Sequence, residues 1–205
     1  KMLGYSTPEL LALTVRQISH PDDKYLADES LRKLHAGEIS SFRIEKRYLH
    51  KNGQVIWAGL TCAVKQDPSG RVIYDISVVE DISERKTAEA RVQYLATHDE
   101  MTGLPNRALF SQLLRLTIDS SLRYKRRFAV LFIDLDRFKI INDTLGHEAG
   151  DQVLKEISQR FRACLRASDV VARLGGDEFV VLVQEIHDDS QVAVVARNIL
   201  SAAIR

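Results

Sequence analysis

Acidic side chains stand at two places in the sequence where a strand is expected to end. The unbroken apolar run 128–133 leads directly to Asp134, and a glycine pair, 175–176, precedes Asp177 and Glu178. Two carboxylates that lie close together repel each other unless a cation sits between them, and Mg²⁺ prefers oxygen ligands of this kind. These residues therefore predict a Mg²⁺ and phosphate site, provided that the fold brings Asp134 near Asp177.

Three short strands are needed to position these carboxylates. The run 128–133 predicts a buried strand, and 169–173 and 179–183 predict two more, joined by a hairpin turn at Gly175-Gly176. Paired glycines suit such a turn because they adopt positive φ and let a phosphate approach the backbone. Each motif alone also has a structural explanation, since a strand-end Asp often caps a helix and Gly-Gly-Asp is often only a turn.

Residues 175–179, Gly-Gly-Asp-Glu-Phe, spell the signature of the GGDEF domain, which is the domain of diguanylate cyclases. The segment 99–107 resembles the opening of that domain, with Met101 where Leu is usual. Further parts of the family's pattern are resembled, in order, by 134–139, 141–143, 146–147 and 150–151. The resemblance covers about residues 95–205 and implies an α+β, palm-like domain with a βαββα core, similar to adenylyl cyclase.

The resemblance to this family implies a metal site. Asp134, Asp177 and the backbone carbonyl of Leu135 would bind Mg²⁺, with two ions in each site and Mn²⁺ as a substitute. Glu178 would help to deprotonate the attacking hydroxyl or would complete the metal shell, and both roles stay open.

The same resemblance implies how the phosphates are held. Lys139 would act in catalysis by binding phosphate, together with the backbone N–H groups of Arg137 and Phe138. Gly175 and Gly176 would add a part of the backbone that the substrate can approach closely.

Recognition of the base is implied for Asn142 and Asp151. A carboxylate such as that of Asp151 accepts from both N1–H and the 2-amino group of guanine, and adenine offers no such pair of donors on that edge. The substrate implied is therefore GTP. His147 lies in the same segment and would touch the ribose or the base, although a structural hydrogen bond explains it equally well.

The implied reaction is a nucleotidyl transfer in which two GTP molecules give pyrophosphate and cyclic di-GMP, a bacterial second messenger in signal transduction. Each domain holds one GTP, so the resemblance also implies a homodimer. Arg166 and Asp169 form an RxxD pattern five residues before Gly175, similar to the family's inhibitory site for the product. A surface Arg–Asp pair in a helix-to-strand connection is the structural alternative.

The first eighty residues predict an α+β domain of a different kind. A capping box at 6–9 predicts a short helix, and a second helical stretch is expected after 20–23. Three strands are expected at 42–50, 55–66 and 71–79, joined by turns that contain Asn-Gly and Pro-Ser-Gly.

Residues 4–6, 20–23, 51–53 and 79–85 resemble, in order, the later part of a PAS sensor domain. A small-molecule sensor and a dimerising or docking module without a ligand both stay open. His20 and His35 could be axial haem ligands, but a lone histidine is more often a hydrogen-bonded or surface residue. Cys62 is expected to pack inside the domain.

The expected organisation is a PAS portion at 1–82, a helical linker at 83–97 and a GGDEF portion at 98–205, with both domains truncated by the ends of the chain. Ala88, Val92 and Leu95 form one seam of the linker helix, which fits either a coiled coil or a solvated helix with an ordinary buried stripe.

Composition narrows the function classes. The net charge is +1 and no basic block is present, so a nucleic-acid partner is not expected. No apolar run approaches the ~18 residues of a membrane span, and two cysteines fit a reducing compartment, so a cytoplasmic location is expected unless segments outside the chain attach it to a membrane.

Two functions remain open from the sequence. One is an active cyclase under PAS control, and the other is a non-catalytic PAS–GGDEF module that binds GTP or cyclic di-GMP and regulates a neighbouring domain. The enzyme is favoured because regulatory copies of the domain usually lose some of the motif residues, whereas this chain keeps all five of Asp134, Asn142, Asp151, Asp177 and Glu178.

Overall fold

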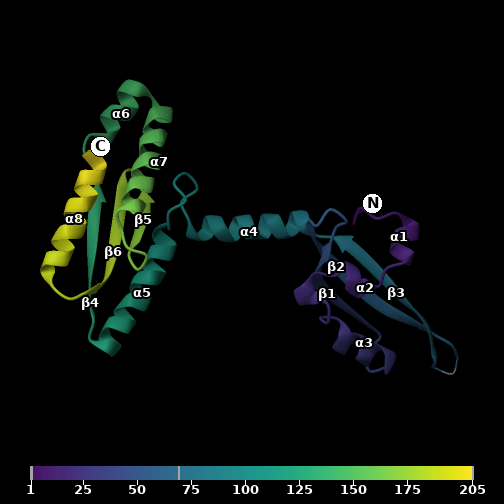
Figure 1. Cartoon of the computed structure of the whole chain (residues 1–205). Helices are drawn as coiled ribbons and strands as arrows, with labels where there is room; N and C mark the ends of the chain where they lie inside the picture. Colours follow the sequence, from purple (N-terminus) through teal and green to yellow (C-terminus); the bar gives the residue numbers. More distant parts are fainter. Residues whose placement is uncertain (1, 69, 205) are drawn as a thin grey trace. The chain divides into compact units, whose positions relative to one another are not determined.

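The computed structural model describes residues 2–68 and 70–204, which form two compact units, Lys1–Ala90 and Arg91–Arg205 (Figure 1). No helix within the described ranges is long and apolar enough to cross a membrane.

The first unit is a three-stranded antiparallel meander preceded by short helices, as the sequence predicts. The sheet order is β1-β2-β3. Its elements are α1 (Thr7–Leu11), α2 (Val15–Ile18), a 3-10 turn (Pro21–Asp23), α3 (Asp28–His35), β1 (Ser41–Leu49), β2 (Val55–Gln66) and β3 (Val72–Asp81).

Capping side chains start the first two helices. The carboxylate of Glu9 accepts a hydrogen bond from the Ser6 backbone N–H at 2.8 Å, which confirms the predicted capping box. The sequence reading missed α2, where the Gln17 side chain accepts from the Thr14 N–H at 2.7 Å. With only four residues, α2 is too short to show a helical period.

The inner face of this sheet carries the core of the first unit. Tyr48, Ile56 and Ala58 form one buried cluster with Leu3. Cys62 is buried in a second cluster with Leu34 and Leu60, so its predicted packing role is confirmed.

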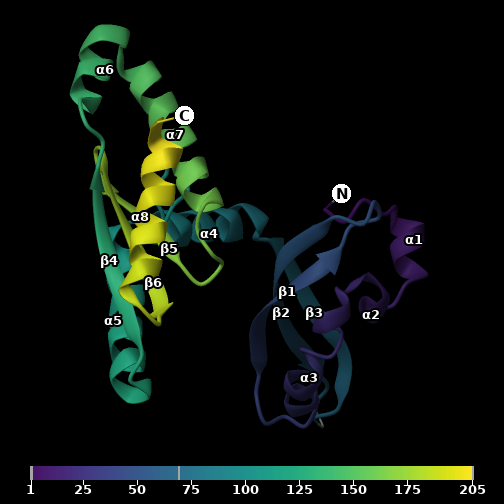
Figure 2. The same cartoon turned by 60° about the vertical axis from the view of Figure 1, so that its left-hand side comes forward.

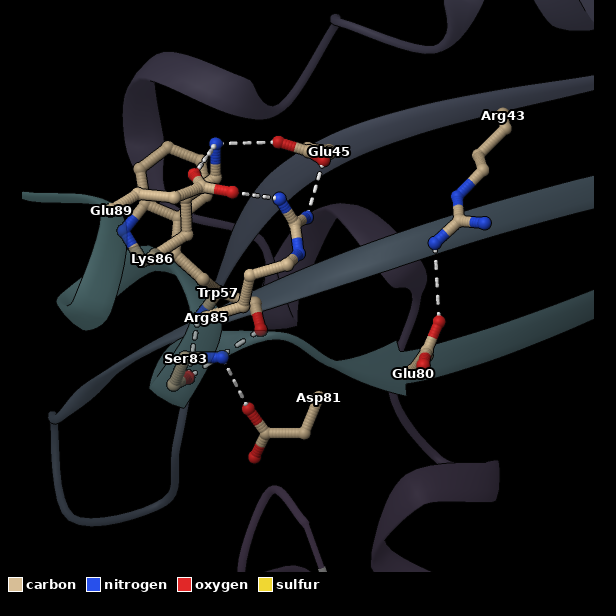
Figure 3. A network of polar contacts seen from close by, with 9 residues as sticks. All are labelled: Arg43, Glu45, Trp57, Glu80, Asp81, Ser83, Arg85, Lys86 and Glu89. Carbon is tan, nitrogen blue, oxygen red and sulfur yellow. Dashed lines mark hydrogen bonds and ion pairs between the residues drawn. The ribbon is translucent and has the colours of Figure 1, made fainter.

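Helix α4 (Ser83–Thr97) covers the predicted linker, and its first turn is tied to the sheet of the first unit (Figure 3). The Glu45 carboxylate on β1 contacts Lys86 at 2.6 Å and Arg85 at 2.5 Å, and these hydrogen bonds lower the pKa of Glu45. No residue of α4 is buried, and Val92 is 66% exposed. The expectation of an ordinary buried stripe along this helix is therefore wrong for the chain alone.

The second unit is a three-stranded antiparallel sheet of order β4-β6-β5, with helices on both faces. Its elements are α5 (Arg107–Tyr124), β4 (Arg127–Asp134), α6 (Phe138–Leu145), α7 (His147–Ala163), β5 (Val170–Gly175), β6 (Glu178–Ile186) and α8 (Asp189–Ile204). The order from β4 to α8 gives the βαββα core, with the first helical position shared by α6 and α7.

Strand β6 is the centre of the second unit and is apolar on both faces. Phe179 and Val181 pack with residues of α7 and α8, while Val180 and Leu182 pack with Phe110 of α5. The alternation follows from the strand period of two.

The prediction of a buried strand at 128–133 needs correction. Strand β4 is an edge strand within the described residues, and Phe132 is 77% exposed. An edge strand has one paired neighbour, so its length and apolar character alone do not give full burial.

Candidate active site

Pairing of β4 with β6 brings the two acidic motifs together. Asp134, the last residue of β4, lies directly opposite Glu178, the first residue of β6. Cβ atoms of residues that face each other in an antiparallel pair lie about 5 Å apart. Asp177 precedes Glu178 in the chain and is half-buried, so three carboxylates stand at one end of the sheet.

The hairpin differs by one residue from the sequence prediction. Gly175 pairs with Glu178, so the turn residues are Gly176 and Asp177 instead of Gly175-Gly176. The register between β5 and β6 shifts after Arg173. The strand pairing therefore extends one residue closer to the turn than expected. Gly176 has φ +53° and Gly175 has φ +148°, values that glycine adopts without strain. Asp177 is consequently placed at the tip of the hairpin.

A hollow of about 330 Å³ lies beside the acidic pair and includes a cation that the sequence reading did not assign to the site. Asp134, Glu178 and Arg107 line it. The Arg107 guanidinium is 3.7 Å from the Glu178 carboxylate, and both side chains are more than half exposed. Water screens such a contact, so Arg107 remains available for another anion.

The hairpin is held from beneath by Arg173, which is 7% exposed. Its guanidinium donates to the Gly176 carbonyl at 2.9 and 2.7 Å and to the Asp99 carboxylate at 3.0 Å. Burial acts to raise the pKa of Asp99, but hydrogen bonds from Thr102 and Arg173 outweigh it and keep that pKa below its usual range. Sequence reasoning missed Arg173, although a charged residue within the apolar strand 170–174 was a usable signal.

The loop between β4 and α6 differs from the prediction at one donor. The Phe138 N–H, expected to bind phosphate, donates to the Leu135 carbonyl at 3.1 Å. That oxygen was expected to bind metal and keeps a second lone pair. The tight turn into α6 accounts for this bond, and Arg137 takes a left-handed φ of +61° there. Lys139 lies exposed in the first turn of α6.

Helix α6, which carries Asn142, packs against α7, which carries Asp151 (Figure 2). A Cβ built on Gly150 would lie 1.9 Å from the Oδ1 atom of Asn142, so the Asn142 side chain occupies the space that this glycine leaves. Asp151 follows directly and is half-buried, whereas His147 is exposed at the start of α7. Gly150 thus lets the Asn142 side chain lie against the helix that carries Asp151.

Arg166 and Asp169 lie in the connection from α7 to β5. The Asp169 carboxylate accepts from the Arg166 N–H at 3.3 Å and from the Gln184 N–H at 3.2 Å, so it fixes this connection to β6. A hollow of about 500 Å³ is lined by Arg162, Arg166 and Asp169. Arg162 was missed, although it stands one helical turn before Arg166.

The oxygen donors at the sheet end fit Mg²⁺. Within 2–68 and 70–204, no group of three or more His, Cys, Asp or Glu side chains is gathered closely enough to hold a metal by itself. Mg²⁺ usually takes one or two carboxylates and completes its shell with water and substrate phosphates. The carboxylates at this end of the sheet, with the hollow beside them, fit that coordination.

Residues 96–204, more than half of the chain, match the family described as diguanylate cyclase, GGDEF domain. The chain belongs to the GGDEF family. Residues 1–79 of this GGDEF protein match the PAS fold.

Two relatives of this GGDEF protein are named as diguanylate cyclases. The Escherichia coli K12 protein named "Probable diguanylate cyclase DgcE" is 35% identical over 207 residues, which cover 98% of this chain and 18% of that protein. The diguanylate cyclase TpbB of Pseudomonas aeruginosa is 48% identical over 113 residues, covering 55% of this chain and 26% of TpbB. The chain therefore spans about a quarter or less of the length of these relatives.

Solved structures agree with the fold of the second unit. The GGDEF domain of TpbB from P. aeruginosa superposes with a TM-score of 0.50 at 50% identity, covering 51% of this chain and 61% of that one. The coiled coil and GGDEF domain of DgcB from Caulobacter crescentus, solved in complex with c-di-GMP, gives a TM-score of 0.53 at 27% identity, covering 58% and 61%.

Proposed function

We propose that this chain is the catalytic and input portion of a diguanylate cyclase that condenses two GTP molecules into cyclic di-GMP and releases two pyrophosphates. The observation that carries the proposal is the register that sets Asp134 opposite Glu178, with Asp177 at the hairpin tip. In each of two steps, a 3′-hydroxyl attacks the α-phosphate of a GTP, its oxygen–phosphorus bond forms, and pyrophosphate leaves in line.

The acidic residues would hold the metal and move the proton. Asp134, Asp177 and the free lone pair of the Leu135 carbonyl would bind Mg²⁺, or Mn²⁺ in its place, as two ions per site. When bound, the ions neutralise phosphate charge and lower the pKa of the attacking hydroxyl. Glu178 stands exposed beside Asp134, where its carboxylate would accept the hydroxyl proton or complete the metal shell.

Cations from two elements would hold the phosphates. Lys139 is exposed at the start of α6, and Arg107 lines the hollow beside Glu178. A phosphate that displaces water from Arg107 would gain charge-assisted hydrogen bonds. The Phe138 N–H would join them only if its bond to Leu135 opens, so the Arg137 N–H and the two side chains would carry most of this role.

The α6–α7 pair would select guanine. Asp151 would accept from N1–H and the 2-amino group, and Asn142 would be held in place by its fit against Gly150. His147, which is exposed at the start of α7, would face the ribose or the base. The selectivity expected is for GTP over ATP.

Two chains must act together, because each domain would hold one GTP and the product joins two. The exposed seam of α4, with Val92 at 66% exposure, would pair two chains and raise the effective concentration of one half-site at the other. The ion pairs of Arg85 and Lys86 with Glu45 tie the start of α4 to the PAS unit, so a change in that unit would reach the helix.

Product inhibition is proposed for the hollow lined by Arg162, Arg166 and Asp169. Arginine side chains bind phosphate groups and stack on the faces of bases such as guanine. Asp169 already accepts hydrogen bonds from the backbone, so its role would be to hold Arg166 in position.

A cytoplasmic location is proposed as well. It is supported by the free thiols of Cys62 and Cys164 and by the proposed GTP substrate.

The test is the conversion of GTP with Mg²⁺ by the whole chain, with cyclic di-GMP and pyrophosphate both quantified. Asp177→Ala should lose turnover while the fold persists, because the substitution removes a side chain at a turn. Asp119→Ala, an exposed aspartate on α5, is the matched control and should keep full activity. Full activity of Asp177→Ala would contradict the metal assignment, and GTP binding without any product would support the regulatory module instead.

A further inference from the structure

The first unit contains a cavity of about 520 Å³ between its sheet and its short helices. The volume lies within the range of small-molecule pockets. Side chains from α1, α2 and α3 form one wall and side chains from all three strands form the other. Most of these side chains are apolar, and they include Leu10, Ile18, Leu31, Leu60 and Val79.

Lys46 of β1 brings a buried charge to this apolar cavity. The residue is 1% exposed and lines the cavity. Its Nζ atom donates to the Ser19 hydroxyl at 2.8 Å and lies 4.9 Å from the ring centre of Tyr48. An ammonium has three donors, so one hydroxyl leaves it poorly compensated for the loss of water. Desolvation accordingly lowers the pKa of Lys46.

The carboxylates nearest to this ammonium are committed to other cations. Asp28 pairs with Arg16 at 2.8 Å, and Asp23 pairs with Arg47 at 2.7 Å. Their charge still acts on Lys46 at a distance and partly offsets the cost of burial.

The remaining charges around the cavity are satisfied as well. Asp75, on the β3 wall, bonds His35 at 2.8 Å. Lys24 also lines the cavity but is exposed to solvent. Among the described residues, Lys46 is therefore the buried cation of this cavity that lacks a carboxylate partner within ion-pair distance.

We propose that this cavity binds an organic monocarboxylate with an apolar chain. Its carboxylate pairs with the Lys46 ammonium, and its apolar chain packs against the apolar side chains that line the cavity. A carboxylate would supply the acceptors that the buried ammonium lacks, and a charge-assisted hydrogen bond to an ammonium that has lost its water is strong. Arg16 also lines the cavity but is paired with Asp28, so the buried cation left for a ligand is a lysine, and its compact charge suits a small carboxylate better than a phosphate, which arginine recognises in bidentate fashion. The inference rests on the proposed function only in making this ligand the input to the cyclase.

The experiment is isothermal titration of the whole chain with straight-chain carboxylates from hexanoate to dodecanoate, each compared with its neutral primary amide. At least one carboxylate should bind, and its amide should bind roughly tenfold or more weakly because it forms no charge-assisted bond with the ammonium. This comparison uses the unaltered protein, so it does not depend on the folding of any variant. Absence of binding across the series, or equal binding of acid and amide, would overturn the proposal.

Two variants localise the effect. Lys46→Met keeps the apolar stem and should bring the carboxylate down to the affinity of the amide. The fold should persist, because the Ser19 hydroxyl still donates to the Val15 carbonyl at 2.7 Å. Lys65→Met, an exposed lysine on β2, is the matched control and should bind as the unaltered chain does. Unchanged preference for the acid in Lys46→Met would place the anion elsewhere and contradict the assignment.

Binding heat needs no turnover, so the two proposals can fail separately. Selective binding of the acid in a chain that makes no cyclic di-GMP would contradict the cyclase and leave the cavity assignment standing. Formation of cyclic di-GMP by a chain that does not bind the carboxylates would support the cyclase and contradict the cavity assignment.

Discussion

Replacing Gly150 by alanine is expected to weaken the binding of GTP without harming the fold. The added Cβ would lie 1.9 Å from the Oδ1 atom of Asn142 and 3.0 Å from its Cγ atom, so the amide must move by about 1 Å or more. The same Cβ would lie 3.2 Å from the Phe138 ring, a contact that a small adjustment can accommodate.

The magnitude follows from what is lost and what is gained. A displaced Asn142 would lose the hydrogen bond to guanine that we propose for it, worth about 1 kcal/mol, which corresponds to roughly a fivefold rise in the KM for GTP. Gly150 lies inside α7 with an ordinary helical φ, so alanine there favours the helix by about 1 kcal/mol. Activity should therefore fall while the thermal midpoint stays level or rises.

Steady-state kinetics and thermal unfolding of Gly150→Ala, Asn142→Ala and the double variant form the assay. Asn142→Ala should show a similar rise in KM, and the double variant should lose little more, because both changes remove the same contact. An unchanged KM in Gly150→Ala, or fully additive losses in the double variant, would refute the reasoning.

Three further outcomes are expected. Arg173→Met removes the buried donors to the Gly176 carbonyl and should lower the free energy of unfolding by about 3 kcal/mol and reduce turnover, as measured by urea denaturation and product formation; a change in neither would contradict the positioning role. Hydrogen bonds from Arg47 lower the pKa of Asp23 from 3.8 to about 2, so their stabilisation should be complete above about pH 4 and fade as the pH falls towards 2. Asp23→Asn should lower the free energy of unfolding by about 2 kcal/mol at pH 7, and denaturation curves of this variant should show a smaller loss of stability between pH 4 and pH 2. The same loss in the variant as in the unaltered chain would contradict the role of the Asp23–Arg47 pair. Arg137→Gly should be more stable to heat than Arg137→Ala by about 1 kcal/mol, since only glycine adopts φ +61° freely, and equal midpoints would argue against strain in that loop.

The strands and turns could be predicted because their signals are local. The apolar run 128–133 predicts a strand from a few neighbouring residues, and β4 lies there. The turn at Asn52-Gly53 likewise predicts the start of the strand that follows it, which is β2. The meeting of Asp134 with the acidic hairpin could also be anticipated, since it requires only that two predicted strands be neighbours.

The missed features depend on contacts between distant residues. The bonds from Arg173 to Gly176 and Asp99 depend on tertiary packing, and no periodicity reports them. The space that Gly150 leaves for Asn142 follows from the packing of α6 on α7. The one-residue difference in the hairpin comes from the register shift after Arg173, which propensity does not encode.

The most direct test of the central claim is the stoichiometry and kinetic order of the reaction with GTP and Mg²⁺. Pyrophosphate and cyclic di-GMP should form in a ratio of two to one, and at low concentration the rate should rise with the square of the protein concentration, because two domains must each bring one GTP. Pyrophosphate without cyclic di-GMP, or a rate strictly proportional to the concentration of a monomeric chain, would contradict the account.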